Sequence, residues 1–144
     1  MRKIKILIAD DHAVVRMGLA SLFSAKADLE VIGQVKNGAL AVREAKRLSP
    51  DVVIMDLMMP GMDGIEATRA LCTATPDVKI LILTSYTTSD GIARALEAGA
   101  RGAVMKSAEN AELITAIRKI AAGERGISPD IRRQLAANPP IPPL

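Results

Sequence analysis

Short apolar runs alternate with longer amphipathic runs along most of the 144-residue chain. The short runs are rich in β-branched residues, whereas the longer runs carry apolar residues every three or four positions, as a helix with one buried face does. The predicted strands are residues 4–9, 29–35, 51–56, 78–84 and 102–106. The predicted helices are residues 12–25, 39–48, 63–73, 89–98 and 108–122.

Regular alternation of strands and helices predicts an α/β domain in which helices cover both faces of a five-stranded parallel sheet. The strands around Ile54 and Leu81 are continuously apolar, as expected for strands that are buried on both sides. We expect right-handed crossovers and the doubly wound strand order 2-1-3-4-5. In that order, a ligand site lies at the carboxyl ends of the first and third strands.

The residues after the last predicted helix begin with a helix-start pattern. Ser128 suits the N-cap, Pro129 suits the first helical position, and Asp130 adds an acid to the first turn. We therefore expect a short helix that ends at about Ala137.

The last segment, residues 138–144, reads Asn-Pro-Pro-Ile-Pro-Pro-Leu and predicts a stiff polyproline spacer. We accordingly divide the chain into a domain over residues 1–123 and a connector over residues 124–144. Since a spacer joins two parts of a protein, we also expect the natural chain to continue beyond Leu144.

Composition narrows the class of protein. Aromatic residues make up 1% of the chain, so the core must be aliphatic and nucleic-acid binding by base stacking is disfavoured. The net charge of +3 comes from scattered basic residues, so we expect no direct DNA binding by this chain.

The lone Cys72 cannot form an internal disulfide and is expected to be a packing residue. Without a signal-peptide core or a membrane-length apolar run, we expect a cytoplasmic protein with no membrane partner.

Polar residues stand where four of the predicted strands end. Asp10 and Asp11 follow the first strand, and Asp56, Thr84 and Lys106 end the third, fourth and fifth strands. In the predicted sheet all of them meet at one edge, where carboxylates raise one another's pKa unless a cation joins them. Oxygen ligands suit Mg²⁺, with Mn²⁺ as a second choice. A carboxylate beside such an ion can attack phosphorus and form an acyl phosphate.

Each of these residues also has a simpler interpretation. Asp10 and Asp11 could cap the following helix, Asp56 could belong to a turn, and Lys106 could be a solvated surface residue. The joint pattern favours a site, because separate strands end in chemically complementary groups at one edge of the sheet.

Four motifs together resemble the receiver domain of two-component response regulators, which has a flavodoxin-like (CheY-like) fold. The resemblance covers roughly residues 3–122, and residues 122–129 are similar to the connector of the NarL/FixJ (LuxR-type) subfamily, in which a helix-turn-helix DNA-binding domain normally follows. The motifs are Asp10-Asp11-His12, Met55 to Gly64, Leu83-Thr84-Ser85 and Met105-Lys106-Ser107.

The resemblance implies that Asp56 is the phosphoacceptor of a sensor histidine kinase. It implies a Mg²⁺ site in which Asp11 is a direct ligand, Asp10 acts through water, and Asp56 and the backbone carbonyl of Met58 complete the set.

The resemblance assigns further roles around the phosphoryl group. Lys106 would pair with the phosphoryl oxygens, and Thr84 would donate a hydrogen bond to them. Tyr86 is expected to shield the site, and Val15 to belong to the kinase-docking face. For His12 we expect a structural role beside the acids and not a phosphohistidine.

The chain departs from the family pattern near its fifth strand. Receivers usually place an aromatic residue three positions before the lysine, where this chain has Ala103, and many have proline where this chain has Ser107. The resemblance implies that the ring changes rotamer on activation. We therefore hypothesise that signalling here depends on the loop after Thr84, including Tyr86, and on displacement of the helix over residues 89–98.

Taken together, the motifs predict a phosphorylation-dependent switch that controls transcription through an attached output domain. We expect self-directed chemistry only and no enzyme turnover: an aspartate-nucleophile phosphatase of the haloacid dehalogenase type needs a second Asp where this chain has Met58. The alternative is a stand-alone receiver or phosphorelay protein without DNA-binding output. A homodimer linked to phosphorylation is a further expectation.

Overall fold

The computed structural model describes residues 2–85 and 89–137. Every neighbouring pair of strands is parallel, and the order is β2-β1-β3-β4-β5-β6. The strands are β1 (Ile4–Ala9), β2 (Leu29–Val35), β3 (Val52–Met55), β4 (Lys79–Thr84), β5 (Gly102–Met105) and β6 (Gly126–Ile127). The helices are α1 (Ala13–Ser24), α2 (Gly38–Leu48), α3 (Gly64–Ala74), α4 (Ser89–Glu97), α5 (Asn110–Ala121) and α6 (Pro129–Ala137).

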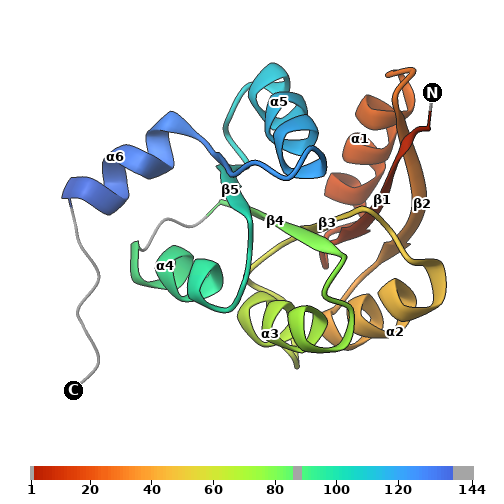
Figure 1. Ribbon diagram of the computed structural model, residues 1–144, viewed down its shortest axis with the longest axis horizontal. Coiled ribbons are helices and arrows are strands. Elements are labelled where there is room, and N and C mark those ends of the chain that lie inside the picture. The colour runs from red at the N-terminus through yellow and green to blue at the C-terminus, as the bar shows by residue number, and fades with distance from the viewer. Residues whose placement is uncertain (1, 86–88, 138–144) are drawn as a thin grey trace.

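Helices cover both faces of the sheet (Figure 1). One core cluster joins α1 and α5 to the sheet through residues such as Phe23 and Ile117, and the other joins α2, α3 and α4 through residues such as Leu71 and Ile92. All four residues of β3 are buried, which confirms the doubly covered sheet that its apolar run predicts. Within the described ranges, none of the helices has the length and apolar character needed to cross a bilayer.

The predicted five strands are present, but the sheet has a sixth, so the prediction of five strands was wrong. β6 continues the ladder beyond β5: Gly126 donates its N–H to the carbonyl of Arg101 at 3.2 Å, and Ser128 donates its N–H to that of Ala103 at 3.0 Å. A Cβ on Gly102 would overlap the Gly126 carbonyl oxygen, so close strand approach depends on glycine. Since two residues carry no hydrophobic period, pattern reasoning missed this strand.

The predicted short helix is present as α6, which contacts α4 and β5. Ile131 is fully buried in the same core cluster as Ala103. The Ser128 carbonyl accepts the N–H of Arg132 at 3.0 Å, but the buried Ser128 Oγ has no hydrogen-bond partner among the described residues, so the predicted side-chain cap does not form. The proline-rich segment 138–144 lies outside the described residues, and the boundary after residue 123 stays a prediction.

Gly99 follows α4 with φ of +120°, a left-handed backbone that favours glycine and confirms the predicted end of this helix. A Cβ at Gly99 would also overlap Sγ of Cys72 on α3. Cys72 is half-buried and packs against the core, in agreement with its predicted packing role.

Candidate functional site

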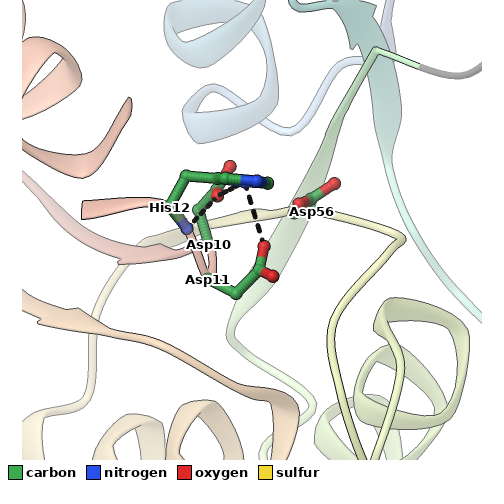
Figure 2. Close-up of side chains that lie close together, drawn as sticks. All are labelled: Asp10, Asp11, His12 and Asp56. Carbon is green, nitrogen blue, oxygen red and sulfur yellow. Dashed lines mark hydrogen bonds and ion pairs between the residues drawn. The ribbon is translucent and has the colours of Figure 1, made fainter. Parts of the chain in front are cut away.

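Three carboxylates meet at the carboxyl ends of β1 and β3 (Figure 2). Asp56 donates its backbone N–H to the carbonyl of Ala9 at 3.0 Å, and Asp10 donates its own to that of Val35 at 3.1 Å, so the strand ladders fix both residues at the sheet edge. Asp10 is 2% exposed and Asp56 is 4% exposed. The side chain of Asp11 is more open, at 30%. The sheet topology thus brings together the acids that the sequence singled out.

Lys106 joins the two buried carboxylates from the end of β5. Its Nζ lies 2.7 Å from Oδ2 of Asp10 and 3.3 Å from Oδ2 of Asp56. Its backbone N–H donates to the carbonyl of Thr84 at 2.8 Å, which ties the ends of β4 and β5 together. One ammonium group therefore serves two buried acids, and the predicted convergence of these residues is observed.

The site shifts the pKa of both Asp56 and Lys106. Burial raises the pKa of the Asp56 carboxyl and the charge of Asp10 raises it further, against the opposing charge of Lys106. Burial alone would lower the pKa of Lys106, but the hydrogen bond to Asp10 and the charges of both acids outweigh it, so this pKa is raised. The site thus holds the lysine cationic and disfavours the Asp56 carboxylate.

These shifts predict that Asp56→Asn stabilises the protein near pH 7 in the absence of divalent cations. A carboxyl whose folded pKa is raised above the ordinary 3.8 costs stability once it ionises, and a neutral amide does not. We expect a gain of about 0.5–2 kcal/mol. The gain should shrink as the pH falls toward 3.8, because the wild-type carboxyl has a raised pKa and takes up its proton before that pH is reached. Urea unfolding with a chelator at both ends of this range measures it; a gain that grows toward acid pH would contradict the assignment.

Gly64 packs the start of α3 directly against the segment that carries Asp56. A Cβ at Gly64 would overlap the Asp56 carbonyl oxygen and lie 2.8 Å from Cα of Leu57. Gly64 also donates its N–H to the carbonyl of Leu57 at 3.1 Å. The preceding Asp63 caps α3 by accepting the N–H of Glu66 at 2.9 Å. Sequence reasoning recognised a helix start here but not that this glycine supports the segment that carries Asp56.

Met58 lies close to the acids through its backbone. Its N–H donates to Oδ1 of Asp56 at 3.3 Å, while its side chain is exposed. Thr84 is fully buried at the end of β4, beside β5. The metal role of the Met58 carbonyl and the phosphate role of Thr84 stay predictions. Tyr86 lies outside the described residues.

The first helix presents apolar side chains next to the site. Val15, the predicted docking residue, is half-buried. Its neighbours Val14 and Met17 are 82% and 68% exposed, so they offer more apolar surface for a partner than Val15 does. The docking role itself stays a prediction.

Two residues at the start of α1, the N-cap His12 and Arg16 in the first turn, hold Asp10 in place. His12 donates its N–H to Oδ1 of Asp10 at 2.8 Å, and its Nδ1 lies 3.2 Å from the same oxygen and 3.1 Å from Oδ1 of Asp11. Arg16 donates Nη1 to the carbonyl of Asp10 at 2.7 Å. Sequence reasoning missed Arg16, although its spacing of four residues from His12 puts both on one helix face.

The donor set suits a hard divalent cation. Three carboxylates and one ammonium carry a formal charge of −3 + 1 = −2, which one Mg²⁺ ion would balance. Carboxylate oxygens are the ligands this ion prefers. Asp10, Asp11 and Asp56 are the residues that would hold it.

A doubly wound parallel sheet with buried acids and a lysine at its carboxyl edge is the arrangement of a receiver domain. Residues 6–118 match the family described as the response regulator receiver domain. The chain belongs to this family of two-component signalling domains, and it is of the NarL/LuxR type.

Its relatives are regulators of the same kind. The transcriptional regulatory protein LiaR of Bacillus subtilis (strain 168) is 48% identical over 121 residues, which cover 84% of this chain and 57% of LiaR. The response regulator GacA of Pseudomonas syringae pv. syringae (strain B728a) is 43% identical over 133 residues, 92% of this chain and 62% of GacA. The chain thus spans about three fifths of the length of these curated relatives.

The solved structures agree with the fold. A two-component response regulator of the LuxR family from Aurantimonas sp. SI85-9A1 superposes with a TM-score of 0.90 at 39% identity, over 94% of this chain and 96% of that one. The receiver fold and the subfamily that the sequence motifs predict are therefore confirmed.

Proposed function

We propose that the chain is a phosphorylation-dependent switch in which Asp56 accepts a phosphoryl group from the phosphohistidine of a sensor histidine kinase. The carrying observation is the position of Asp56: its carboxylate is buried at the sheet edge, 3.3 Å from Lys106 Nζ and beside Asp10. A carboxylate so placed has a cation at hand for the charge of a transferring phosphoryl group.

Transfer requires an Asp56 oxygen to attack the phosphorus while the phosphorus–nitrogen bond of the donor breaks and its electron pair returns to the imidazole. A bound Mg²⁺ would supply charge stabilisation for the phosphoryl oxygens. The Lys106 ammonium contacts Asp10 and Asp56, and it would exchange one of these contacts for a hydrogen bond to a phosphoryl oxygen. Thr84, at the end of the neighbouring strand, would donate its hydroxyl hydrogen to another.

The chemistry is self-directed in this proposal. The residue two positions after Asp56 is Met58, so the acid that a phosphatase would need there is missing, which supports a switch over an enzyme. The output would be transcription control through an attached DNA-binding part. Two observations support this: both relatives are longer than this chain, and LiaR is named a transcriptional regulatory protein. A stand-alone receiver or phosphorelay protein is the second candidate. We retain a homodimer linked to phosphorylation as part of the proposal.

Phosphorylation by acetyl phosphate tests this function without a cognate kinase. We expect intact-protein mass spectrometry to show one added phosphoryl group per chain in the presence of Mg²⁺ and almost none with a chelator. The group should decay without being replaced once the donor is removed. Uptake that ignores the chelator would contradict the metal site, and no stable phosphoryl group on the chain under any condition would contradict the proposed function.

The structural response should concentrate around α4. Ala103 has no ring to rotate, and it is fully buried in the same core cluster as Ile131 of α6, while its carbonyl accepts the N–H of Ser128 at 3.0 Å. A phosphoryl group shifts an equilibrium only through contacts that differ between the two states, and the aromatic contribution is absent here. Amide hydrogen exchange with and without beryllofluoride should change most over residues 84–98 and little over residues 102–105. A dominant change in β5 would refute this.

A further inference from the structure

His12 adds a nitrogen donor to the rim of the acidic site. Ligand atoms of Asp10, Asp11, His12 and Asp56 all lie within 4.8 Å of one another. Figure 2 shows the His12 ring directed at the carboxylates of Asp10 and Asp11. The acids alone form an oxygen site, so the imidazole changes the chemical class of ion that the cluster can select.

The distances fit coordination of one small ion. Bonds of about 2.0–2.2 Å to nitrogen and oxygen place the ligands of a tetrahedral ion about 3.3–3.6 Å apart. Nδ1 of His12 lies 3.1 Å and 3.2 Å from its two carboxylate neighbours, close to this spacing, whereas the full set lies within 4.8 Å and would draw together around an ion. Asp10 and Asp56 are buried, so their positions are fixed by the surrounding structure. The His12 side chain is 67% exposed and can rotate toward an ion that these acids hold.

Binding of an ion would change the tautomer of His12. Without an ion, Nδ1 can donate a hydrogen bond to the carboxylates of Asp10 and Asp11 that it faces. With the hydrogen on Nε2 instead, the Nδ1 lone pair becomes available to an ion held by the same carboxylates. Imidazole suits Zn²⁺, Cu²⁺ and Ni²⁺, whereas carboxylates with water suit Mg²⁺ and Mn²⁺. Adding an imidazole to the carboxylates therefore raises the affinity of the site for Zn²⁺, Cu²⁺ and Ni²⁺ relative to its affinity for Mg²⁺.

We propose that His12 is a direct ligand for a borderline transition-metal ion such as Zn²⁺, and that this ion competes with Mg²⁺ for the site. The inference rests on the metal site of the proposed function and extends it. Zn²⁺ with four protein ligands leaves no position for a phosphoryl oxygen. In this closed form Asp56 is a ligand, so Zn²⁺ would hold the receiver in a state that cannot be phosphorylated.

The chain offers a clean test, because His12 is its only histidine. Tag-free protein labelled with ¹⁵N should show a large shift of the imidazole nitrogen signals on addition of Zn²⁺ and none of that kind with Mg²⁺. Calorimetry should show that the affinity for Zn²⁺ falls by more than about tenfold in His12→Asn. Loss of a residue that only supports a metal ligand already costs about tenfold in affinity, so loss of a direct ligand should cost at least as much. The affinity for Mg²⁺ should change by less than about twofold, because oxygen donors carry it.

Each outcome separates ligation from a structural role. If His12 only positions Asp10 and Asp11, His12→Asn should weaken both ions alike, and that result would overturn the proposal. Asp11→Asn, which removes a shared ligand, should weaken both. Unshifted imidazole signals in the wild-type protein would also overturn it, without depending on the folding of any variant. Failure of the proposed function would appear differently, as absent Mg²⁺-dependent phosphorylation with the Zn²⁺ response of His12 intact.

Discussion

Asp56→Asn should take up no measurable phosphoryl group from acetyl phosphate, with an initial rate at least about a thousandfold below wild type. An amide is not a nucleophile toward phosphorus, and the remaining acids are poorly placed to replace it. Asp10 is engaged by the Lys106 ammonium at 2.7 Å and by the backbone N–H of His12 at 2.8 Å. Asp56 has a buried carboxylate that lies 3.3 Å from Lys106 Nζ and accepts the backbone N–H of Met58 at 3.3 Å.

Asp51→Asn is the matched control for this variant. Asp51 precedes the same strand, β3, at its opposite end, where its carboxylate contacts Arg2 and the N–H of Lys5. The control makes the same chemical change and leaves every group of the site in place, so its phosphorylation should match wild type. If Asp56→Asn took up a phosphoryl group at the wild-type rate, the phosphoacceptor would have to be another residue, such as Asp10 or Asp11. Equal loss in both variants would indicate damage to β3.

Gly64→Ala should destabilise the protein by about 3 kcal/mol and slow phosphorylation about a hundredfold. The added Cβ would overlap the Asp56 carbonyl oxygen and press on Leu57 Cα at 2.8 Å. Both obstacles are backbone atoms, which cannot move aside as the end of a flexible side chain does, so either α3 or the Asp56 segment must shift. A misplacement of about 1 Å in a reacting group is enough for a rate loss of this size.

Gly18→Ala provides the opposite result from the same substitution. Gly18 lies in α1, where a Cβ would meet nothing within 4 Å. Alanine there should stabilise the helix by about 0.5–1 kcal/mol and leave phosphorylation unchanged. Urea unfolding and initial rates of acetyl phosphate labelling measure both variants. A Gly64→Ala protein as stable and as reactive as wild type would show that the α3 contact does not position Asp56.

The order of the first five strands followed from the sequence because each has its own apolar run, and a parallel sheet constrains how such runs connect. The meeting of Asp10, Asp56 and Lys106 then followed from topology alone, since all three end strands on one edge. No such pattern marks β6. Its pairing depends on the close approach that Gly102 permits, and a two-residue strand has no period to detect.

Finer features of the site lay beyond sequence reasoning. Strand order does not determine that Lys106 lies nearer to Asp10 than to Asp56, at 2.7 Å against 3.3 Å, because rotamers and burial set that difference. The bond from Arg16 to the Asp10 carbonyl likewise depends on where the first turns of α1 direct a long side chain. The close overlap that a Cβ at Gly64 would make with the Asp56 carbonyl appears only once α3 is packed.

Chemical trapping of the phosphorylated residue tests the central claim most directly. Borohydride reduces an acyl phosphate to an alcohol, so an aspartyl phosphate becomes homoserine at the residue that carried it. After treatment with acetyl phosphate and Mg²⁺ and then with borohydride, peptide mass spectrometry should find homoserine in place of Asp56. Protein that received borohydride without acetyl phosphate should keep aspartate there. Homoserine in place of Asp10 or Asp11, or a phosphoryl group that survives reduction, would contradict the assignment of Asp56 as the phosphoacceptor.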